Sequence, residues 1–269
     1  MQGALGATRL RALRILIGGY ALLYTLARLP ELWAIAHYPA SEMEPTGLAR
    51  FALPAPVVIA IAVATCVLLG AFVAGWRYRV VAPLAALGLV FVFSYRSAWG
   101  QIFHTENLLV LHVCALALAP ATSVGREGDH AWWVRLLAVL TVLTYVMAGI
   151  AKLRLAGLAW LDGDQLRNQI AIDNLRKALL GASTAPLARP LLEHPAWFAP
   201  VSVATLVVEL AAPVALLGRR LAVAWVTLAW AFHVGVLLLM WIVFPYPLVG
   251  FAFLPLLPAE KLLPRKLRL

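Results

Sequence analysis

The residues with the clearest chemical potential lie in the stretch 145–164, which reads YVMAGIAKLRLAGLAWLDGD. It begins inside an apolar run of about twenty residues, the length typical of a helix that crosses a bilayer. Lys152 lies near the outer end of that run, and Tyr145 lies seven residues earlier on the same helical face. An ammonium group at the mouth of a membrane helix is costly unless it has a partner or a function. Lys152 is therefore a candidate functional residue, and the rest of the chain is read as the structure around it.

Other titratable side chains interrupt the remaining apolar segments. His104 and Asn107 are expected to share a helical face in the first turns of one segment, at a depth similar to that of Lys152. Glu209 and His233 each lie about 13–15 Å from the outer surface, near the midplane, at a rise of 1.5 Å per residue. The pattern predicts an upper layer of Lys152 and His104 and a lower layer of Glu209 and His233.

Each of these residues also has a structural interpretation. Lys152 could extend to the outer head groups, and His104 could be an ordinary histidine of the interface. Glu209 could be a protonated acid, or it could pair with His233 and hold two helices together.

Aromatic and charged residues near the segment ends are expected to be structural. Arg96 and Glu106 are predicted to pair in the outer loop between two segments. Tryptophans at the segment ends are typical of anchors at the membrane interface. They are Trp99, Trp160 and Trp241.

A metal site is not predicted. His104, Glu106 and His112 are close in sequence, but His104 and Glu106 point to different sides of a helix. The two cysteines, Cys66 and Cys114, lie within apolar runs and show no metal-binding spacing.

Composition identifies the class of protein. Of 269 residues, 63% are hydrophobic and 13% are charged, whereas soluble domains are about half apolar and a quarter charged. The formal net charge of +10 suits cytoplasmic loops that meet anionic lipid, so we expect a lipid bilayer and no nucleic acid as partner. The sequence predicts an all-α, polytopic membrane helical bundle, and residues 1–269 are expected to form one transmembrane domain without an appended soluble domain.

Eight apolar segments are predicted to cross the bilayer. They are 11–28, 55–75, 80–96, 102–119, 132–153, 200–217, 221–241 and 246–258. The eighth is short and crowded by prolines, and it could be tilted or re-entrant. Arginines in the short loops 76–79 and 218–220 place these loops inside, so that both termini are expected on the cytoplasmic side of the cell (inner) membrane.

One amphipathic helix is predicted in the long outer connection 154–199. Asp162 with Gln165 indicates an N-cap with a capping-box partner, and Gly181 is a natural C-terminal glycine. One side is expected to be apolar and the other basic, as in a helix that lies in the membrane interface over the outer mouth. The apolar side holds Leu166, Ile170, Ile172, Leu175 and Leu179, and the basic side holds Arg167, Arg176 and Lys177.

Three strings of this sequence resemble a known family. They are RSAWGQIFHTENLLVLH at 96–112, YVMAGIAKL followed by WLDGDQLRN within 145–168, and ELAAPVALL with AFHVGVLLLMWIVFPY within 209–246. Together they resemble the HTTM (horizontally transferred transmembrane) domain family, whose multi-span domain is shared with vitamin K-dependent gamma-carboxylase. The resemblance covers nearly the whole chain.

The resemblance implies specific roles. In the carboxylase, the lysine of the matching string is assigned as the base that acts on reduced vitamin K, and its histidine is tied to the carboxylation chemistry. Carried over by resemblance, these roles fall on Lys152 and His104. The implied cofactor is a reduced naphthoquinone of the vitamin K or menaquinol type, with O₂ and CO₂ if the protein is a carboxylase, and a protein or peptide substrate is a possible partner. The side chains expected to bind the quinone are Trp99, Asn107, Tyr145, Glu209 and His233.

Three functions follow from these observations. The first is an enzyme that uses a reduced naphthoquinone at the extracytoplasmic face, with Lys152 as a neutral amine in a low-dielectric pocket and His104 moving a proton or orienting an intermediate. The second is a non-enzymatic membrane factor for the maturation or export of another protein. The third is a proton-coupled transporter with Glu209 and His233 as relay, which the absence of an inverted sequence repeat disfavours.

Overall fold

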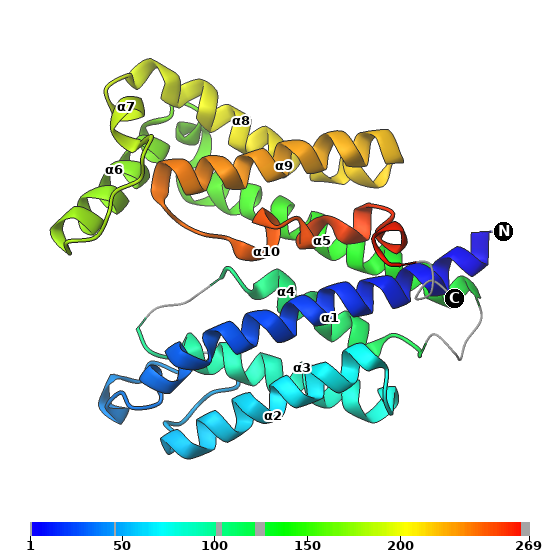
Figure 1. Cartoon of the computed structure of the whole chain (residues 1–269). Coiled ribbons are helices and arrows are strands. Elements are labelled where there is room, and N and C mark those ends of the chain that lie inside the picture. The colour runs from blue at the N-terminus through cyan, green and yellow to red at the C-terminus, as the bar shows by residue number, and fades with distance from the viewer. Residues whose placement is uncertain (1, 46, 101–103, 122–126, 265–269) are drawn as a thin grey trace. The chain divides into compact units, whose positions relative to one another are not determined.

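The computed structural model describes residues 2–45, 47–100, 104–121 and 127–264, and the regular structure within these ranges is entirely helical (Figure 1). The predicted all-α class is confirmed. The chain divides into two compact units, Met1–Leu137 with Pro258–Leu269, and Ala138–Leu257. Each unit is described by itself below.

The first unit is built on four helices and the start of a fifth. These are α1 (Gln2–Ile35), α2 (Ala55–Ala74), α3 (Tyr78–Arg96), α4 (Asn107–Leu118) and the first turns of α5 (Glu127–Ala156). Helix α2 packs against both α1 and α3, α4 packs against α1 and α3, and the short 3₁₀ helix η6 (Ala259–Leu262) lies along α1. Fully buried aliphatic side chains such as Leu13, Leu69 and Leu89 fill the space between the long helices, and this apolar burial stabilises the unit.

The second unit begins within α5. Its further elements are η2 (Gly157–Trp160), α6 (Asp164–Leu179), α7 (Ala188–Leu192), η3 (Pro195–Trp197), α8 (Phe198–Leu210), η4 (Ala212–Leu216), α9 (Arg219–Met240), α10 (Pro245–Leu248) and η5 (Phe251–Leu256). Helices α8 and α9 lie side by side, and α6 and α7 contact the same end of the pair (Figure 1). Val142, Trp225, Ala229 and Phe253 belong to the main apolar core.

Five helices among the described residues are long and apolar enough to cross a membrane. They are Gly6–Ile35, Ala55–Ala74, Tyr78–Arg96, His130–Trp160 and Arg219–Met240. Two further apolar helices, Asn107–Leu118 and Pro195–Leu210, are shorter. The predicted count of eight spans is not confirmed, because only five of the predicted segments contain a helix of sufficient length.

In the described residues, none of the three remaining predicted segments forms one long helix. In segment 102–119, helix α4 begins only at Asn107. In segment 200–217, α8 ends at Leu210 and a 3₁₀ helix follows around Pro213. Segment 246–258 contains the last three residues of the four-residue helix α10 and then η5, which includes Pro255. Proline lacks a backbone N–H and clashes with the preceding turn, which explains the breaks in the last two segments.

Helix α6 confirms the helix predicted in the connection 154–199 and corrects its details. Gly181 has the expected left-handed backbone, with φ of 72°. The N-cap is Gly163 rather than Asp162, and Asp162 instead accepts a hydrogen bond from the backbone N–H of Asp164 at 3.0 Å.

The apolar residues of α6 lie on two faces rather than the single predicted face. Leu166 and Ile170 are buried against Phe198 and neighbouring side chains. Ile172, Leu175 and Leu179 are exposed. Helix α6 therefore presents one apolar face to the protein and another to its surroundings.

Helix α6 and the following loop close the C-terminal end of α9. Three donors reach three consecutive carbonyls at the end of that helix: Leu187 N–H to Leu238 at 3.0 Å, Asn174 Nδ2 to Leu239 at 2.9 Å, and Lys177 Nζ to Met240. The last carbonyls of a helix have no partner within the helix, and an unpaired carbonyl is costly in an apolar environment. The sequence placed Lys177 on a basic surface, but its ammonium group caps α9.

Candidate functional site

Lys152 forms an ion pair with Glu209 in the second unit. The ammonium of Lys152 donates a hydrogen bond to Oε1 of Glu209, which comes from α8. The Glu209 side chain is only 3% exposed and that of Lys152 22%. Nζ of Lys152 also lies 5.3 Å from the ring centroid of Trp160 and 5.8 Å from that of Phe232. The amine thus has a buried acidic partner and aromatic neighbours.

Helix α5 positions the lysine through residues spaced by four and then three. Tyr145, Gly149 and Lys152 lie on one face. A Cβ atom at Gly149 would lie 2.8 Å from Cδ2 of Leu210 and 3.2 Å from Cβ of Glu209. Glycine therefore allows α8 to approach α5 closely enough for the Glu209 carboxylate to reach Lys152.

The residues that follow α5 position the Trp160 ring beside Lys152. Trp160 Nε1 donates to the carbonyl of Ser202 at 3.3 Å, and Ser202 Oγ donates to the carbonyl of Trp160 at 2.5 Å. Gly163 has a φ of 89°, and a Cβ atom there would lie 2.4 Å from the backbone carbonyl carbon of Phe198. These contacts join η2 to the start of α8 and hold the Trp160 ring beside Lys152.

A second buried pair lies two turns earlier along α5. The Tyr145 hydroxyl and Nε2 of His233 share a hydrogen bond at 2.8 Å, and both side chains are buried. The Tyr145 ring packs edge-on against Trp225, with ring centroids 4.9 Å apart. The predicted face shared by Tyr145 and Lys152 is confirmed by their contacts with α9 and α8. The predicted pairing of Glu209 with His233 is wrong, since depth in the bilayer does not determine which side of a helix a residue faces.

Two polar atoms of these pairs have unused bonding capacity. Oε2 of Glu209 and Nδ1 of His233 are buried and have no hydrogen-bond partner among the described residues. Buried polar groups in folded proteins are nearly always hydrogen-bonded, and exceptions need an explanation. The two pairs thus place an amine and a phenol on one face of α5, each hydrogen-bonded to a side chain of a neighbouring helix.

The other predicted site residues belong to the first unit. His104 is exposed and precedes α4, so its predicted position on that helix is wrong. Asn107 is the first residue of α4 and is exposed. Trp99 is half-buried and packs edge-on against Tyr95 and Tyr38, with centroid distances of 5.6 and 5.9 Å. A joint role of these three residues with Lys152 stays a prediction.

No protein-family model, curated protein or solved structure matches this chain. The resemblance to HTTM proteins therefore remains an expectation from the three sequence strings.

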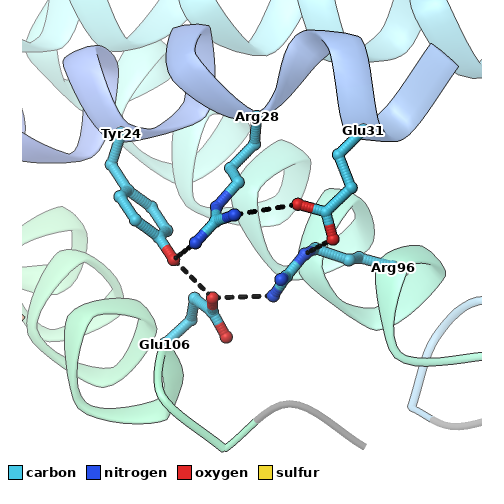
Figure 2. A network of polar contacts seen from close by, with 5 residues as sticks. All are labelled: Tyr24, Arg28, Glu31, Arg96 and Glu106. Carbon is cyan, nitrogen blue, oxygen red and sulfur yellow. Dashed lines mark hydrogen bonds and ion pairs between the residues drawn. The ribbon is translucent and has the colours of Figure 1, made fainter. Parts of the chain in front are cut away.

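A polar network of the first unit joins α1, α3 and the start of α4 (Figure 2). Arg96 donates from Nε to Glu31 and from Nη1 to Glu106, both at 2.7 Å, so the predicted Arg96–Glu106 pair is confirmed. Tyr24 donates to Glu106 at 2.6 Å, and Arg28 donates to Tyr24 at 2.8 Å and to Glu31 at 3.0 Å.

Sequence reasoning missed the α1 half of this network. Tyr24, Arg28 and Glu31 follow a spacing of four and three on one face of α1, which was the available signal. The carboxylate of Glu106 and the guanidinium of Arg96 are both buried. Because every charged group in Figure 2 touches an opposite charge, the network is best explained as a clasp between helices.

Metal ligands are not assembled in the part of the chain that the structure describes. No group of three or more His, Cys, Asp or Glu side chains there could hold a metal ion. His112, one of the residues considered from the sequence, is buried, and its Nε2 lies 3.2 Å from the carbonyl of Leu137.

Proposed function

We propose that this chain is an integral membrane enzyme of the HTTM type that uses a reduced naphthoquinone at the extracytoplasmic face, with Lys152 as base. The observation that carries the proposal is the Lys152–Glu209 pair: the amine is held by a buried carboxylate and flanked by aromatic rings. Charged groups inside apolar helices are expensive and usually functional. A purely structural lysine would gain more from extending to the head groups.

The residues around the amine fit a flat ring that carries hydroxyl groups. Trp160 and Phe232 provide apolar faces beside Nζ of Lys152. Oε2 of Glu209 and Nδ1 of His233 provide polar atoms that lack partners within the described chain. A reduced naphthoquinone would supply an aromatic diol that can release protons and electrons.

The chain's own groups suggest where the proton goes. The Lys152 ammonium donates its hydrogen bond to the Glu209 carboxylate, so a proton can pass between the two groups. With that proton on Glu209, Lys152 is a neutral amine whose lone pair can accept the proton of a phenolic hydroxyl, leaving an ammonium beside Glu209. His233, which is bonded to Tyr145 through Nε2, offers Nδ1 as a second site for a proton.

The membrane setting is part of the same proposal. Five long apolar helices support an integral membrane protein. With both termini cytoplasmic, as the arginine-containing loops predict, the end of α5 that carries Lys152 faces outward. The role predicted for His104 from the sequence, to move a proton or to orient an intermediate, is part of this proposal.

The test is quinol binding and turnover by the full chain in lipid nanodiscs. We expect the wild-type protein to bind reduced menaquinone and to accelerate its oxidation by dissolved O₂, which takes up the two electrons and two protons of the quinol. Lys152→Met should abolish turnover, because the amine is the base. A thermal unfolding transition, at a lower temperature than in the wild type because Glu209 has lost its partner, checks that the variant folds. Arg154→Met removes an exposed cation two residues away and should leave turnover unchanged. Absence of quinol binding by the wild-type chain, or full turnover by the Lys152→Met variant, would refute the proposal.

A further inference from the structure

A cavity of the second unit lies outside the Lys152 site. It has a volume of about 380 Å³ and is lined by residues of α7, η3, α8 and α9, among them Leu191, Trp197, Val201, Gly235 and Leu239. Small-molecule sites have volumes of about 300–1,000 Å³ and mainly apolar walls. None of Tyr145, Lys152, Glu209 and His233 lines this cavity. We call it the α7–α9 groove.

The lining is apolar apart from the ring of His194 and the indole nitrogen of Trp197. Its space is bounded on one side by a glycine: a Cβ atom at Gly235 would meet nothing within 4 Å. A larger side chain at position 235 would therefore grow into the groove without displacing the backbone.

The groove continues an apolar stripe that the protein itself leaves uncovered. Leu228, Ala231, Gly235 and Leu238 recur at helical spacing along one side of α9. Leu228 is 56% exposed, and only 17% of the apolar window of α9 is buried within the chain. In a helix long enough to cross a bilayer, such a stripe is covered by lipid.

Residues near the groove are typical of the membrane interface. Trp197 lines it and is 62% exposed, and Trp241, just beyond α9, is 48% exposed. Exposed tryptophans gather where acyl chains meet head groups. The side chain of Arg189, which directly precedes the lining residue Pro190, is 90% exposed and forms an ion pair with the exposed Glu193 at 3.0 Å. Exposed ion pairs contribute little to stability, so the guanidinium can exchange this partner. A cation in this place suits a phosphate group.

We propose that the α7–α9 groove binds one acyl chain of a bilayer phospholipid, whose phosphate lies near Arg189. The exposed apolar stripe of α9 runs into the groove, so an acyl chain that lies along α9 can enter it. The apolar lining then shields the acyl chain from water and head groups. This inference is independent of the chemistry at Lys152, because the two sites share no lining residue.

A photoactivatable phospholipid with a diazirine on its acyl chain tests the proposal. The full chain is reconstituted in nanodiscs that contain this lipid, irradiated and digested, and the labelled peptides are identified by mass spectrometry. We expect labelling within 187–201 and 235–239 that excess unlabelled phospholipid reduces. Gly235→Leu and, from the α8 side, Val201→Phe should each lose most of it. Gly70→Leu changes another helical glycine whose Cβ would meet nothing within 4 Å, and it should keep the wild-type labelling.

Three results would overturn the proposal. Labelling that neither filling variant reduces would show only general contact with lipid. Competition by menaquinone but not by phospholipid would show that the groove holds the tail of a quinone. Loss of the folded state in both filling variants, seen in thermal unfolding, would show that the space is not open to an acyl chain.

Discussion

A lysine and a glutamate that meet between apolar helices can serve structure, chemistry or both. The Glu209 side chain is 3% exposed, so its charge has lost most of its hydration. Removing one partner of a buried pair is strongly destabilising, whereas replacing both by apolar residues is often neutral. This difference separates the contribution of the pair to folding from its contribution to proton transfer.

A double-mutant cycle on Lys152 and Glu209 measures the contribution of the pair to folding. Glu209→Leu alone leaves the ammonium without its carboxylate and should destabilise the protein by about 3–5 kcal/mol. Lys152→Met combined with Glu209→Leu should recover most of that loss, because no charge is left unpaired. Unfolding by heat or denaturant in detergent measures both values.

Activity of the double variant completes the cycle. We expect no quinol turnover in it, although it is stable. A double variant that is as unstable as Glu209→Leu alone would show that the two side chains are not coupled, and would contradict the ion pair.

The sequence could show on which helices these residues lie, but it could not show which side chains form pairs. The spacing of Tyr145 and Lys152 fixed a common face on one helix, and the contacts of both residues with α8 and α9 agree with it. The partner of Glu209 depends on how α8 is rotated and how closely it approaches α5, and that approach depends on Gly149. A small residue in an apolar helix gives no such information until the neighbouring helix is known.

At the scale of elements, helix α6 is held by polar contacts at the end of α9. Asn174 is the centre of these contacts. Its Nδ2 donates to the carbonyls of Ile170 and Leu239, and its Oδ1 accepts from the N–H of Ala185 at 2.7 Å. One buried amide therefore joins α6, α9 and the loop before α7.

Asn174→Ala should destabilise the second unit. The change leaves the Leu239 carbonyl and the Ala185 N–H without their partner, at about 1–3 kcal/mol for a buried group left unpaired. Thermal unfolding measures the effect. Asn168→Ala, at an exposed position of the same helix, should stay within about 0.5 kcal/mol of the wild type. Equal stability of the two variants would mean that Asn174 does not cap α9.

The junction between η2 and α6 depends on close backbone approach. Gly163 and Gly157 both have positive φ, 89° and 59°, but only Gly163 faces the backbone of α8; a Cβ at Gly157 would meet nothing within 4 Å. Gly157→Ala should cost about 1–2 kcal/mol, the penalty of a left-handed conformation. Gly163→Ala should cost clearly more, because the methyl group also collides with Phe198.

Thermal unfolding of the two alanine variants tests this junction. Expression and folding of the Gly163→Ala variant should suffer more than those of Gly157→Ala. A larger loss in Gly157→Ala would be inconsistent with the packing of η2 on α8.

At the scale of the whole molecule, the sequence described the long helices better than the short ones. Segments such as 55–75 and 221–241 match the bounds of α2 and α9 to within two residues, because a long run of apolar residues without an internal break favours a single continuous helix. Segment 55–75 has its one proline, Pro56, in the first turn, where a helix tolerates it. Segments 200–217 and 246–258 contain internal prolines such as Pro213 and Pro255. Hydrophobicity alone could not show that these chains fold as shorter helices and 3₁₀ turns.

Orientation in the membrane can be measured with single cysteines. In a background with Cys66→Ala and Cys114→Ala, we expect Ser183→Cys, in the predicted outer connection, to react with a membrane-impermeant maleimide on intact cells. Arg220→Cys, in a predicted inner loop, should react only after permeabilisation. Both native positions are exposed. The opposite pattern would invert the topology and place Lys152 at the cytoplasmic face.

The charge balance of the network in Figure 2 matters if its helices cross a membrane that carries a voltage. With all four groups ionised, Arg28 and Arg96 balance Glu31 and Glu106. A voltage of 100 mV acts on each uncompensated charge with about 2.3 kcal/mol if that charge crosses the membrane. A cluster whose charges cancel experiences no net electrical force, so α1, α3 and α4 can stay joined whether the membrane is energised or not.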